Sequence, residues 1–586
     1  MANIILGKVA ITWKGAWESG TAYNEQDVVS DGASTYICTV SASTPGSQPN
    51  ATAGEWDQFA QGTKDIAVAA GDLVFNNGVG LQALAVGNEN DVLSVNSSGL
   101  PVWIPKAVRS GQRVRNLFKF DYIDRNGYDQ FVVMEDGSIR AWGYGGAYAI
   151  GNGSNSSNQG VPNIIPFGLG FPGIKDDPNE CTFWAHHHYS YHAIDENGHV
   201  WAWARYGHDS IYSMTGTNGD AWIPINLMKF DNTGNAFNPQ TGLQSAKAVA
   251  MGGGSQGYVA AGILGTDGKV YMCGYNGYSQ LGTGDTSNSP FFTRSAVLSS
   301  HVDEDPTNNA IVKFRLGRDP YANAAAVDAS GRLFMWGYNG DYQLGNGTSS
   351  NASTPFQLTW NDDDGNLVVL SDVYPVFHST YAKDDQDRLW YWGTDHYGVS
   401  GLGVNTGSSG NTSHVTPTRT IGNVNKFAVS NYDYPSAYVL THDKKVYGTG
   451  YNGYGQLGID NADAQSSWVE MDLSMLQDGE TVEHIFCGGQ GSYQSFGILT
   501  NQGRVYTCGY NSYGQLGVGD NNSRYTLTEV PCRDQIVEAT FTGHERYTNL
   551  QVRLADGQML IAGCGDNNQL ASEDGEEYYT LSPVRF

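Results

Sequence analysis

One nine-residue segment, Gly-Tyr-Asn-x-x-x-Gln-Leu-Gly, recurs along this chain. Four clear copies begin at Gly274, Gly337, Gly450 and Gly509. Each follows a short apolar run that is itself preceded by a tight turn. The turn residues recur about every 60 residues, a period typical of repeat architectures. They define eight units, with turn residues Gly137, Gly198, Gly268, Gly331, Asp387, Lys444, Gly503 and Gly557.

A second column of residues lies five positions after each turn residue. Tryptophan, cysteine and alanine replace one another there, which indicates a buried position facing a tapering interior. The column consists of Trp142, Trp203, Cys273, Trp336, Trp392, Thr449, Cys508 and Ala562.

Units of this length hold four short strands, and one such sheet cannot bury both of its faces alone. We therefore expect an all-β protein whose residues 113–586 form a β-propeller, with eight units counted and seven or eight blades. A solenoid is the alternative architecture, but it would need polar capping repeats at both ends, and the repeats show none.

The composition agrees with an all-β fold and limits the classes of binding partner that we expect. The 75 glycines and 35 tyrosines suit turns and strands, whereas charged residues make up only 16%. A net charge of −27 opposes binding to nucleic acid, which needs a basic surface. The seven cysteines contain no Cys-x-x-Cys pair, and we expect them to be small buried residues.

The repeats resemble those of the regulator-of-chromosome-condensation family, whose propellers carry DGxVxxWGxNxxGQLGxG. The resemblance covers residues 113–586 and implies a propeller, typically of seven blades in that family. It also raises guanine-nucleotide exchange on chromatin as a remote alternative function. The acidic charge of this chain and its lack of a basic tail oppose that function, and a shared fold does not transfer function.

The first 112 residues differ from the repeats and fall into two parts. Residues 1–64, with Trp17, Tyr23, Tyr36 and Trp56, resemble the small carbohydrate-binding-like β-modules of bacterial chitinases and of phage virion proteins. Alternatively, these aromatic residues form the core of a small domain. Residues 65–112 resemble the glycine- and aspartate-marked assembly segment of phage tail fibres.

These two resemblances imply a bacteriophage (cyanophage-like) virion structural protein, either a tail fibre or a receptor-binding adhesin. Residues 1–112 would contact other virion proteins, and the propeller would bind a host-surface glycan or protein. We expect a homo-oligomer, with a trimer as one arrangement. The N-terminus lacks the apolar core of a signal peptide, and no apolar run reaches membrane-spanning length. We therefore expect synthesis in the host cytoplasm, localisation to the virion and no membrane insertion.

Candidate ligand-binding residues come from two places in the propeller. Tyr278, Tyr397, Tyr454 and Tyr513 recur within the glycine motif, so in a propeller they would lie on one rim. They would form an aromatic arc for sugars or proteins, or each would pack on its neighbouring blade. The longest excursion, residues 205–244, adds Tyr206, Tyr212 and Trp222.

No catalytic, cofactor or metal site is expected. His186 and His188 would share a strand face, but two ligands do not complete a metal site. The acidic runs 362–364 and 384–385 are interpreted as turns. A polysaccharide-degrading tail enzyme is the main alternative; it would need paired carboxylates in a groove, which sequence alone does not reveal.

Overall fold

The computed structural model comprises two compact units, Met1–Arg109 and Ser110–Phe586. In the first unit the structure describes the backbone of eight strands. In the second it describes residues 113–117, 129–143, 159–167, 171–175, 183–186, 190–204, 221–227, 243–252, 259–317, 322–404, 412–430, 434–544, 547–571 and 576–586.

The first unit contains a four-stranded sheet and two hairpins. The sheet has the order β1-β2-β3-β4, in which only the β1–β2 pair is parallel, and the hairpins are β5–β6 and β7–β8. The predicted division into an attachment module and an assembly segment concerns function and stays a prediction. The strands are β1 (Thr12–Ala16), β2 (Asp27–Asp31), β3 (Ser34–Cys38), β4 (Trp56–Ala60), β5 (Leu73–Asn76), β6 (Leu81–Leu84), β7 (Val92–Val95) and β8 (Pro101–Ile104).

The second unit consists of eight four-stranded antiparallel sheets, each formed by consecutive strands, which we number blades 1 to 8 in chain order. The first four blades contain β9 (Val114–Leu117), β10 (Asp129–Met134), β11 (Ile139–Gly143), β12 (Gln159–Ile164), β13 (Phe183–His186), β14 (Ser190–Ile194), β15 (Val200–Ala204), β16 (Ala221–Asn226), β17 (Ala246–Gly252), β18 (Ala260–Gly265), β19 (Val270–Gly274), β20 (Ser289–Arg294), β21 (Ile311–Leu316), β22 (Asn323–Asp328), β23 (Leu333–Gly337) and β24 (Ala352–Leu358).

Blades 5 to 8 continue the same pattern to the end of the chain. They contain β25 (Leu370–Pro375), β26 (Ser379–Asp384), β27 (Leu389–Asp395), β28 (Thr412–Ile421), β29 (Val424–Val429), β30 (Ser436–Thr441), β31 (Val446–Gly450), β32 (Gln465–Glu470), β33 (Val482–Gly488), β34 (Ser495–Thr500), β35 (Val505–Gly509), β36 (Arg524–Glu529), β37 (Ile536–His544), β38 (Tyr547–Leu554), β39 (Met559–Gly563) and β40 (Tyr578–Pro583).

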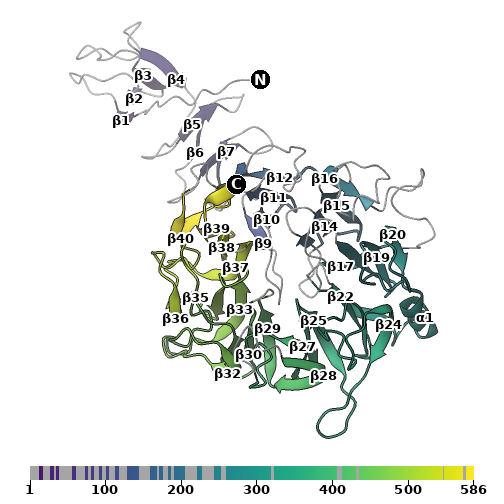
Figure 1. Cartoon of the computed structure of the whole chain (residues 1–586). Coiled ribbons are helices and arrows are strands. Elements are labelled where there is room, and N and C mark those ends of the chain that lie inside the picture. Colours follow the sequence, from purple (N-terminus) through teal and green to yellow (C-terminus); the bar gives the residue numbers. More distant parts are fainter. Residues whose placement is uncertain are drawn as a thin grey trace. The chain divides into compact units, whose positions relative to one another are not determined.

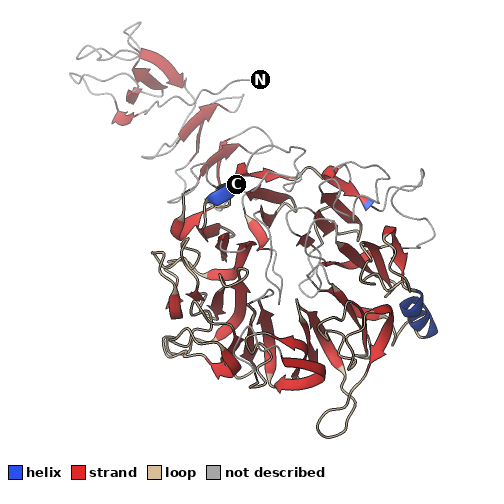
Figure 2. Ribbon diagram, viewed as in Figure 1, coloured by secondary structure: helices blue, strands red, loops and turns tan. Residues whose placement is uncertain are grey.

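The eight blades form a ring in which the sequence runs once around (Figure 1), and strands dominate every blade (Figure 2). The expectation of an all-β propeller is confirmed, with eight sheets for the eight units counted. Because each blade is a complete meander, no strand is exchanged to close the ring. Blades 8 and 1 are instead joined by hydrogen bonds, such as Trp142 Nε1 to the Gln569 carbonyl at 2.7 Å and Leu117 N to Glu538 Oε2 at 3.0 Å.

The turn residues predicted from the repeat occupy the hairpin between the second and third strands of every blade. All eight have positive φ, between 56° at Asp387 and 85° at Gly557. Glycine reaches this region freely, whereas Asp387 and Lys444 adopt it despite a Cβ atom. The sequence alignment therefore identified the same backbone position in each unit.

Several hairpins also carry a buried aspartate three residues before the turn residue. Asp384 is fully buried and accepts hydrogen bonds from the main-chain N–H of Gln386 and Arg388, from Arg388 Nε at 2.7 Å and from Trp390 Nε1 at 2.8 Å. The neighbouring Asp385 is exposed. The interpretation of residues 384–385 and 362–364 as turns is confirmed by turn hydrogen bonds at both.

One element was not predicted from the sequence. Helix α1 (Ala296–Glu304) lies between blades 3 and 4 and buries only Leu298 and Val302, one turn apart. Two apolar contacts are too few to give a periodic signal of helix length. A short 3-10 turn, η4 (Asp566–Asn568), lies between β39 and β40. Within the described residues, no helix has the length and apolar character needed to cross a membrane.

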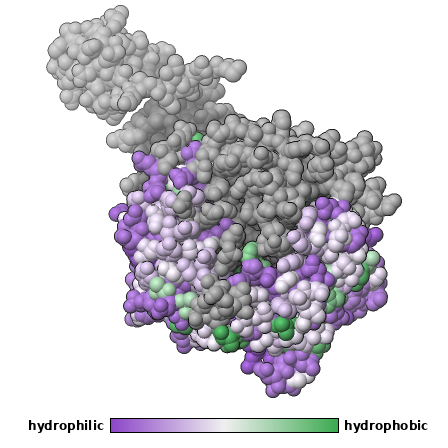
Figure 3. Space-filling model, in the orientation of Figure 1, coloured by the Kyte–Doolittle hydropathy of each residue, from purple (hydrophilic) through white to green (hydrophobic). Residues whose placement is uncertain are grey.

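The apolar core lies between adjacent blades. Aromatic pairs cross these junctions, such as Phe131 with Tyr191 at 5.1 Å and Tyr381 with Phe427 at 4.7 Å between ring centroids. The described surface shown in Figure 3 is mainly hydrophilic, with small scattered apolar areas. In an antiparallel meander, the loops after the first and third strands of every blade emerge on one rim of the ring.

Candidate functional site

The repeated motif folds into a loop held by its own asparagine and glutamine. In blade 6, Asn452 Oδ1 accepts a hydrogen bond from Leu457 N at 2.8 Å, and Asn452 Nδ2 donates to the Asn461 carbonyl at 2.8 Å. Gln456 Oε1 accepts from Tyr454 N at 3.0 Å. Both side chains are fully buried, and their amide groups provide hydrogen-bond partners for backbone groups of the loop. The result is a fixed position for Tyr454 on the rim.

In several blades, the residue five positions after the turn also ties the motif loop of the preceding blade to its own blade. All eight residues of the column are fully buried, which confirms the expected burial. Sequence analysis missed a second role that Trp336, Trp392, Thr449 and Cys508 share with Trp142, which is to donate a hydrogen bond to a main-chain carbonyl in the preceding loop. The donor–acceptor pairs are Trp336 Nε1 with Gln280 at 2.9 Å, Trp392 Nε1 with Gln343 at 2.8 Å, Thr449 Oγ1 with Gly398 at 2.9 Å, and Cys508 Sγ with Gln456 at 3.5 Å.

Three tyrosines meet where blade 5 adjoins blade 6. Tyr397 comes from the third loop of blade 5, whereas Tyr434 and Tyr451 come from the first and third loops of blade 6. The Tyr397 and Tyr434 rings are stacked at 5.2 Å and 28°, and Tyr451 meets them edge-on at 5.1 and 5.0 Å. All three side chains are half-buried.

The junction of blades 6 and 7 repeats this arrangement. Tyr454 and Tyr493 are stacked at 6.1 Å and 29°, and Tyr510 meets them edge-on at 5.0 Å from each. Tyr510 is 6% exposed, whereas Tyr454 and Tyr493 are half-buried.

Smaller groups occupy two further junctions. Between blades 3 and 4, Tyr278 lies 5.4 Å from Tyr338 and 6.0 Å from Tyr275. Between blades 7 and 8, Tyr513 lies 5.4 Å from Tyr547. We call the complete set the tyrosine row: Tyr275, Tyr278, Tyr338, Tyr397, Tyr434, Tyr451, Tyr454, Tyr493, Tyr510, Tyr513 and Tyr547.

The predicted arc of Tyr278, Tyr397, Tyr454 and Tyr513 therefore lies on one rim, and each member packs on the neighbouring blade. The two alternatives weighed from sequence both describe the geometry, because the rings pack between blades while keeping part of their surface exposed. Whether they bind a ligand stays a prediction.

The first-loop members of the row were missed by sequence analysis. An aromatic residue stands ten positions before the turn residue in six consecutive units, and this spacing could have revealed the column. Its members are Tyr258, Tyr321, Phe377, Tyr434, Tyr493 and Tyr547. Of these, Tyr258 and Tyr321 lie outside the described residues.

The remaining predicted ligand-binding residues are not placed by the structure. Tyr206 and Tyr212 lie outside the described residues, and Trp222 lies in β16, whose description at that position is limited to the backbone. Their role stays a prediction.

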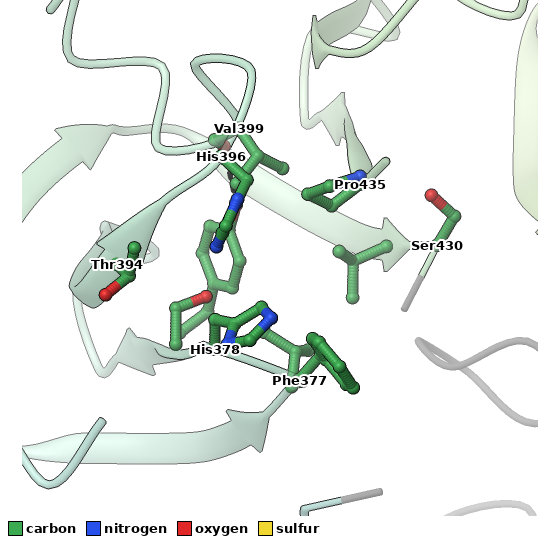
Figure 4. Close-up of a pocket in the computed structure, with 11 residues that line it drawn as sticks. Phe377, His378, Thr394, His396, Val399, Ser430 and Pro435 are labelled. Atoms are coloured by element: carbon green, nitrogen blue, oxygen red, sulfur yellow. Dashed lines mark hydrogen bonds between the residues drawn. The ribbon is translucent and has the colours of Figure 1, made fainter. Parts of the chain in front are cut away.

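The junction of blades 4 and 5 interrupts the tyrosine row. Asp341 stands where the other loops carry the motif tyrosine, and its Oδ2 lies 2.9 Å from His378 Nδ1. The His378 ring lies 4.5 Å from that of His396. Figure 4 shows both rings in a small pocket whose other side is formed by Ser430 and Pro435 of blade 6.

Within the row, the Tyr451 hydroxyl is held in the neutral form. Burial is the main cause that raises the pKa of Tyr451, and the nearby Tyr454, Tyr397, Tyr434 and Tyr493 add to the shift. The Tyr451 hydroxyl is therefore a hydrogen-bond donor as well as an acceptor at neutral pH.

The described residues offer little that resembles a metal or acid–base centre. No group of three or more His, Cys, Asp or Glu residues within them is arranged to hold a metal ion. His186 is described only by its backbone, and His188 lies outside the described residues. Every described carboxyl group with a resolved pKa shift is shifted downward, as at Asp520, whose pKa Arg524 and Asn522 lower to about 2. A general acid would need the opposite shift.

The fold and the row together define a β-propeller of eight four-stranded blades with an aromatic rim. Three stretches within these blades match the model of the "Regulator of chromosome condensation (RCC1) repeat", residues 267–318, 330–369 and 502–539.

Curated relatives share the repeats over part of their length. The ultraviolet-B receptor UVR8 of Arabidopsis thaliana is 24% identical over 263 residues, which are 45% of this chain and 53% of UVR8. The E3 ubiquitin-protein ligase HERC2 of Homo sapiens is 25% identical over 327 residues, which are 55% of this chain and 6% of HERC2. This chain thus spans about half of UVR8 and a small part of HERC2.

Two solved structures align with this chain at low identity. Human WBSCR16 aligns with a TM-score of 0.48 and 17% identity, covering 70% of this chain and 96% of that one. Prp20p from Saccharomyces cerevisiae aligns with a TM-score of 0.46 and 14% identity, covering 67% and 87%.

Proposed function

We propose that this chain is a bacteriophage virion protein whose propeller binds a glycan of the host surface through the tyrosine row. The observation that carries the binding proposal is the row itself: aromatic clusters repeated at successive blade junctions of a rigid ring. The resemblance of residues 1–64 and 65–112 to phage virion segments supports the setting. In that setting, the first unit contacts other virion proteins and the propeller faces the host.

Tyrosine is suited to recognising sugars. Its ring offers an apolar face to the C–H side of a sugar, and its hydroxyl can exchange hydrogen bonds with sugar hydroxyls. A tyrosine side chain also loses little conformational entropy on binding. In this row the entropy loss is reduced further, because Tyr434 and Tyr493 already pack against two neighbouring rings.

The loops at the 5/6 and 6/7 clusters also discriminate between ligands by charge. Residues 394–404, 451–464 and 488–495 contain no lysine or arginine, and Asp460 and Asp463 are exposed beside the clusters. A phosphate- or carboxylate-rich ligand would find no lysine or arginine within these three segments to pair with. A neutral glycan fits this surface best.

Two measurements test the proposal. The full chain is applied to an array of bacterial surface polysaccharides. We expect the wild-type chain to bind neutral glycans, and we expect variants with substitutions in the tyrosine row to lose this binding. A map of the assembled particle is expected to show the propeller on the outer side and the first unit against neighbouring virion proteins. Absence of any array signal would overturn the binding role, and a propeller buried inside the particle would overturn the proposed orientation.

A further inference from the structure

The clusters at the junctions of blades 5/6 and 6/7 have a similar internal geometry, with stacked ring centroids 5.2 Å apart in the first and 6.1 Å apart in the second. In each, the motif tyrosine of one blade stacks on the first-loop tyrosine of the next, at 28° in one cluster and 29° in the other. The third ring meets this pair edge-on, with centroid distances of 5.0 to 5.1 Å and interplanar angles of 60° to 73°. Two equivalent aromatic surfaces are thus presented one blade apart.

The two clusters are joined through a single loop. Tyr451 belongs to the first cluster and Tyr454 to the second, and only two residues separate them in the motif loop of blade 6. That loop is fixed by the buried Asn452 and Gln456. The spacing of the two aromatic surfaces is therefore set by the rigid part of the repeat and does not depend on a mobile linker.

Gly453 leaves room for the Tyr451 ring to lie over its own loop. A Cβ atom at Gly453 would collide with the hydroxyl and the outer ring atoms of Tyr451. The same relation holds between Gly277 and Tyr275 in blade 3. The tyrosine ring therefore lies folded over its own loop.

We propose that these two clusters are tandem subsites for one neutral polysaccharide chain, whose equivalent sugar units contact successive blades. This inference rests on the proposed glycan-binding function and adds the class of ligand: a polymer with a repeating unit in place of a single sugar. Two similar binding surfaces at a fixed spacing are complementary to a polymer whose sugar units also repeat at a fixed spacing. Charge selects the same class, because neither cluster loop carries a cation.

The two tandem subsites have no counterpart on the blade 4 side of blade 5. At the 4/5 junction Asp341 and His378 form a polar pair in place of stacked tyrosines. On the other side, the 7/8 junction retains two tyrosines, Tyr513 and Tyr547, and lies next in line after the second subsite. The polymer therefore runs from blade 5 toward blade 8.

Binding at two linked subsites makes affinity depend on chain length. A fragment that reaches both subsites gains an intramolecular second contact, which raises affinity by about 10²-fold over a fragment that fills one. The probe is a set of defined-length fragments of the neutral polysaccharide that gives the strongest array signal. The full chain is titrated with each fragment by calorimetry.

Single variants separate the two subsites. Tyr434→Leu and Tyr493→Leu each remove one stacked ring while keeping apolar packing, and Tyr447→Leu, at the opposite end of blade 6, is the matched control. We expect either rim variant to lower affinity for long fragments to the level of short ones, while affinity for short fragments changes by no more than about twofold because one subsite remains. Thermal unfolding midpoints, compared with that of Tyr447→Leu, show whether each variant is folded.

The outcomes distinguish this inference from the function on which it rests. No glycan binding by the wild-type chain would refute the proposed function. Binding with equal affinity for all fragment lengths would leave the function intact and refute the tandem subsites, and this result needs no variant.

Discussion

Trp336 Nε1 donates a hydrogen bond of 2.9 Å to the main-chain carbonyl of Gln280, joining blade 4 to the motif loop of blade 3. Gly282 lies against the same indole, and a Cβ atom there would approach Trp336 Nε1 to 2.8 Å. The last glycine of one repeat and the tryptophan of the next are therefore one packing unit. This relation explains why the motif recurs and why its loops hold the tyrosines in fixed places.

Replacing Trp336 by phenylalanine removes the donor and leaves the Gln280 carbonyl buried without it. We expect a loss of about 1–3 kcal/mol in the free energy of unfolding, seen as a lower midpoint in urea. Tyr447→Phe removes an exposed hydrogen bond to Glu470 and is the control. Equal midpoints for the two variants would contradict the importance of the Trp336 bond.

Asp384 and Asp385 are adjacent acids with opposite environments. Asp384→Asn weakens the buried bonds to Arg388 and Trp390, so we expect destabilisation of about 3 kcal/mol, as for other broken buried pairs. Asp385→Asn, at an exposed position, should change stability by less than about 0.5 kcal/mol. Chemical denaturation of both variants measures the difference, and similar losses would refute the assigned role of Asp384.

Burial lowers the pKa of His192 to about 4 from its ordinary value of 6.5. Between these values the unfolded chain binds a proton that the folded chain does not, so stability falls as pH drops from about 6.5 to 4. A shift of this size corresponds to about 3 kcal/mol.

His192→Gln removes this titration. We expect the difference in stability between wild type and variant to fall with decreasing pH across that window, measured by urea midpoints. A pH-independent difference would show that His192 is not a buried neutral group.

The propeller scaffold could be predicted from the sequence because each repeat contains residues that its own local structure requires. The turn column marks residues that need positive φ, and the eight copies of it count the blades. The column five residues after each turn residue marks buried positions. Each of these is a local requirement of one residue type, so it is visible along the chain.

The clusters themselves were harder to predict, because they form between units. Tyr397 and Tyr434 come from different blades, and their stacking depends on how those blades pack. Helix α1 was missed for a similar reason, since two buried residues leave little pattern. The residues 205–220, which include Tyr206 and Tyr212, lie outside the described structure.

Gly453→Ala tests how the first cluster keeps its shape. The added methyl would displace the Tyr451 ring, so we expect weaker glycan binding with little change in the unfolding midpoint. Ser512, at the equivalent position of blade 7, already carries a side chain, and Ser512→Ala is the matched control. Unchanged affinity of Gly453→Ala would argue against a role for the Tyr451 ring.

The binding role of the tyrosine row is tested most directly by the double variant Tyr434→Leu/Tyr493→Leu. Its affinity for the neutral polysaccharide that the wild-type chain binds is measured by calorimetry, beside the control Tyr447→Leu. We predict that the folded double variant loses detectable binding while the control retains wild-type affinity. Wild-type affinity in the folded double variant would contradict the proposed role of the row.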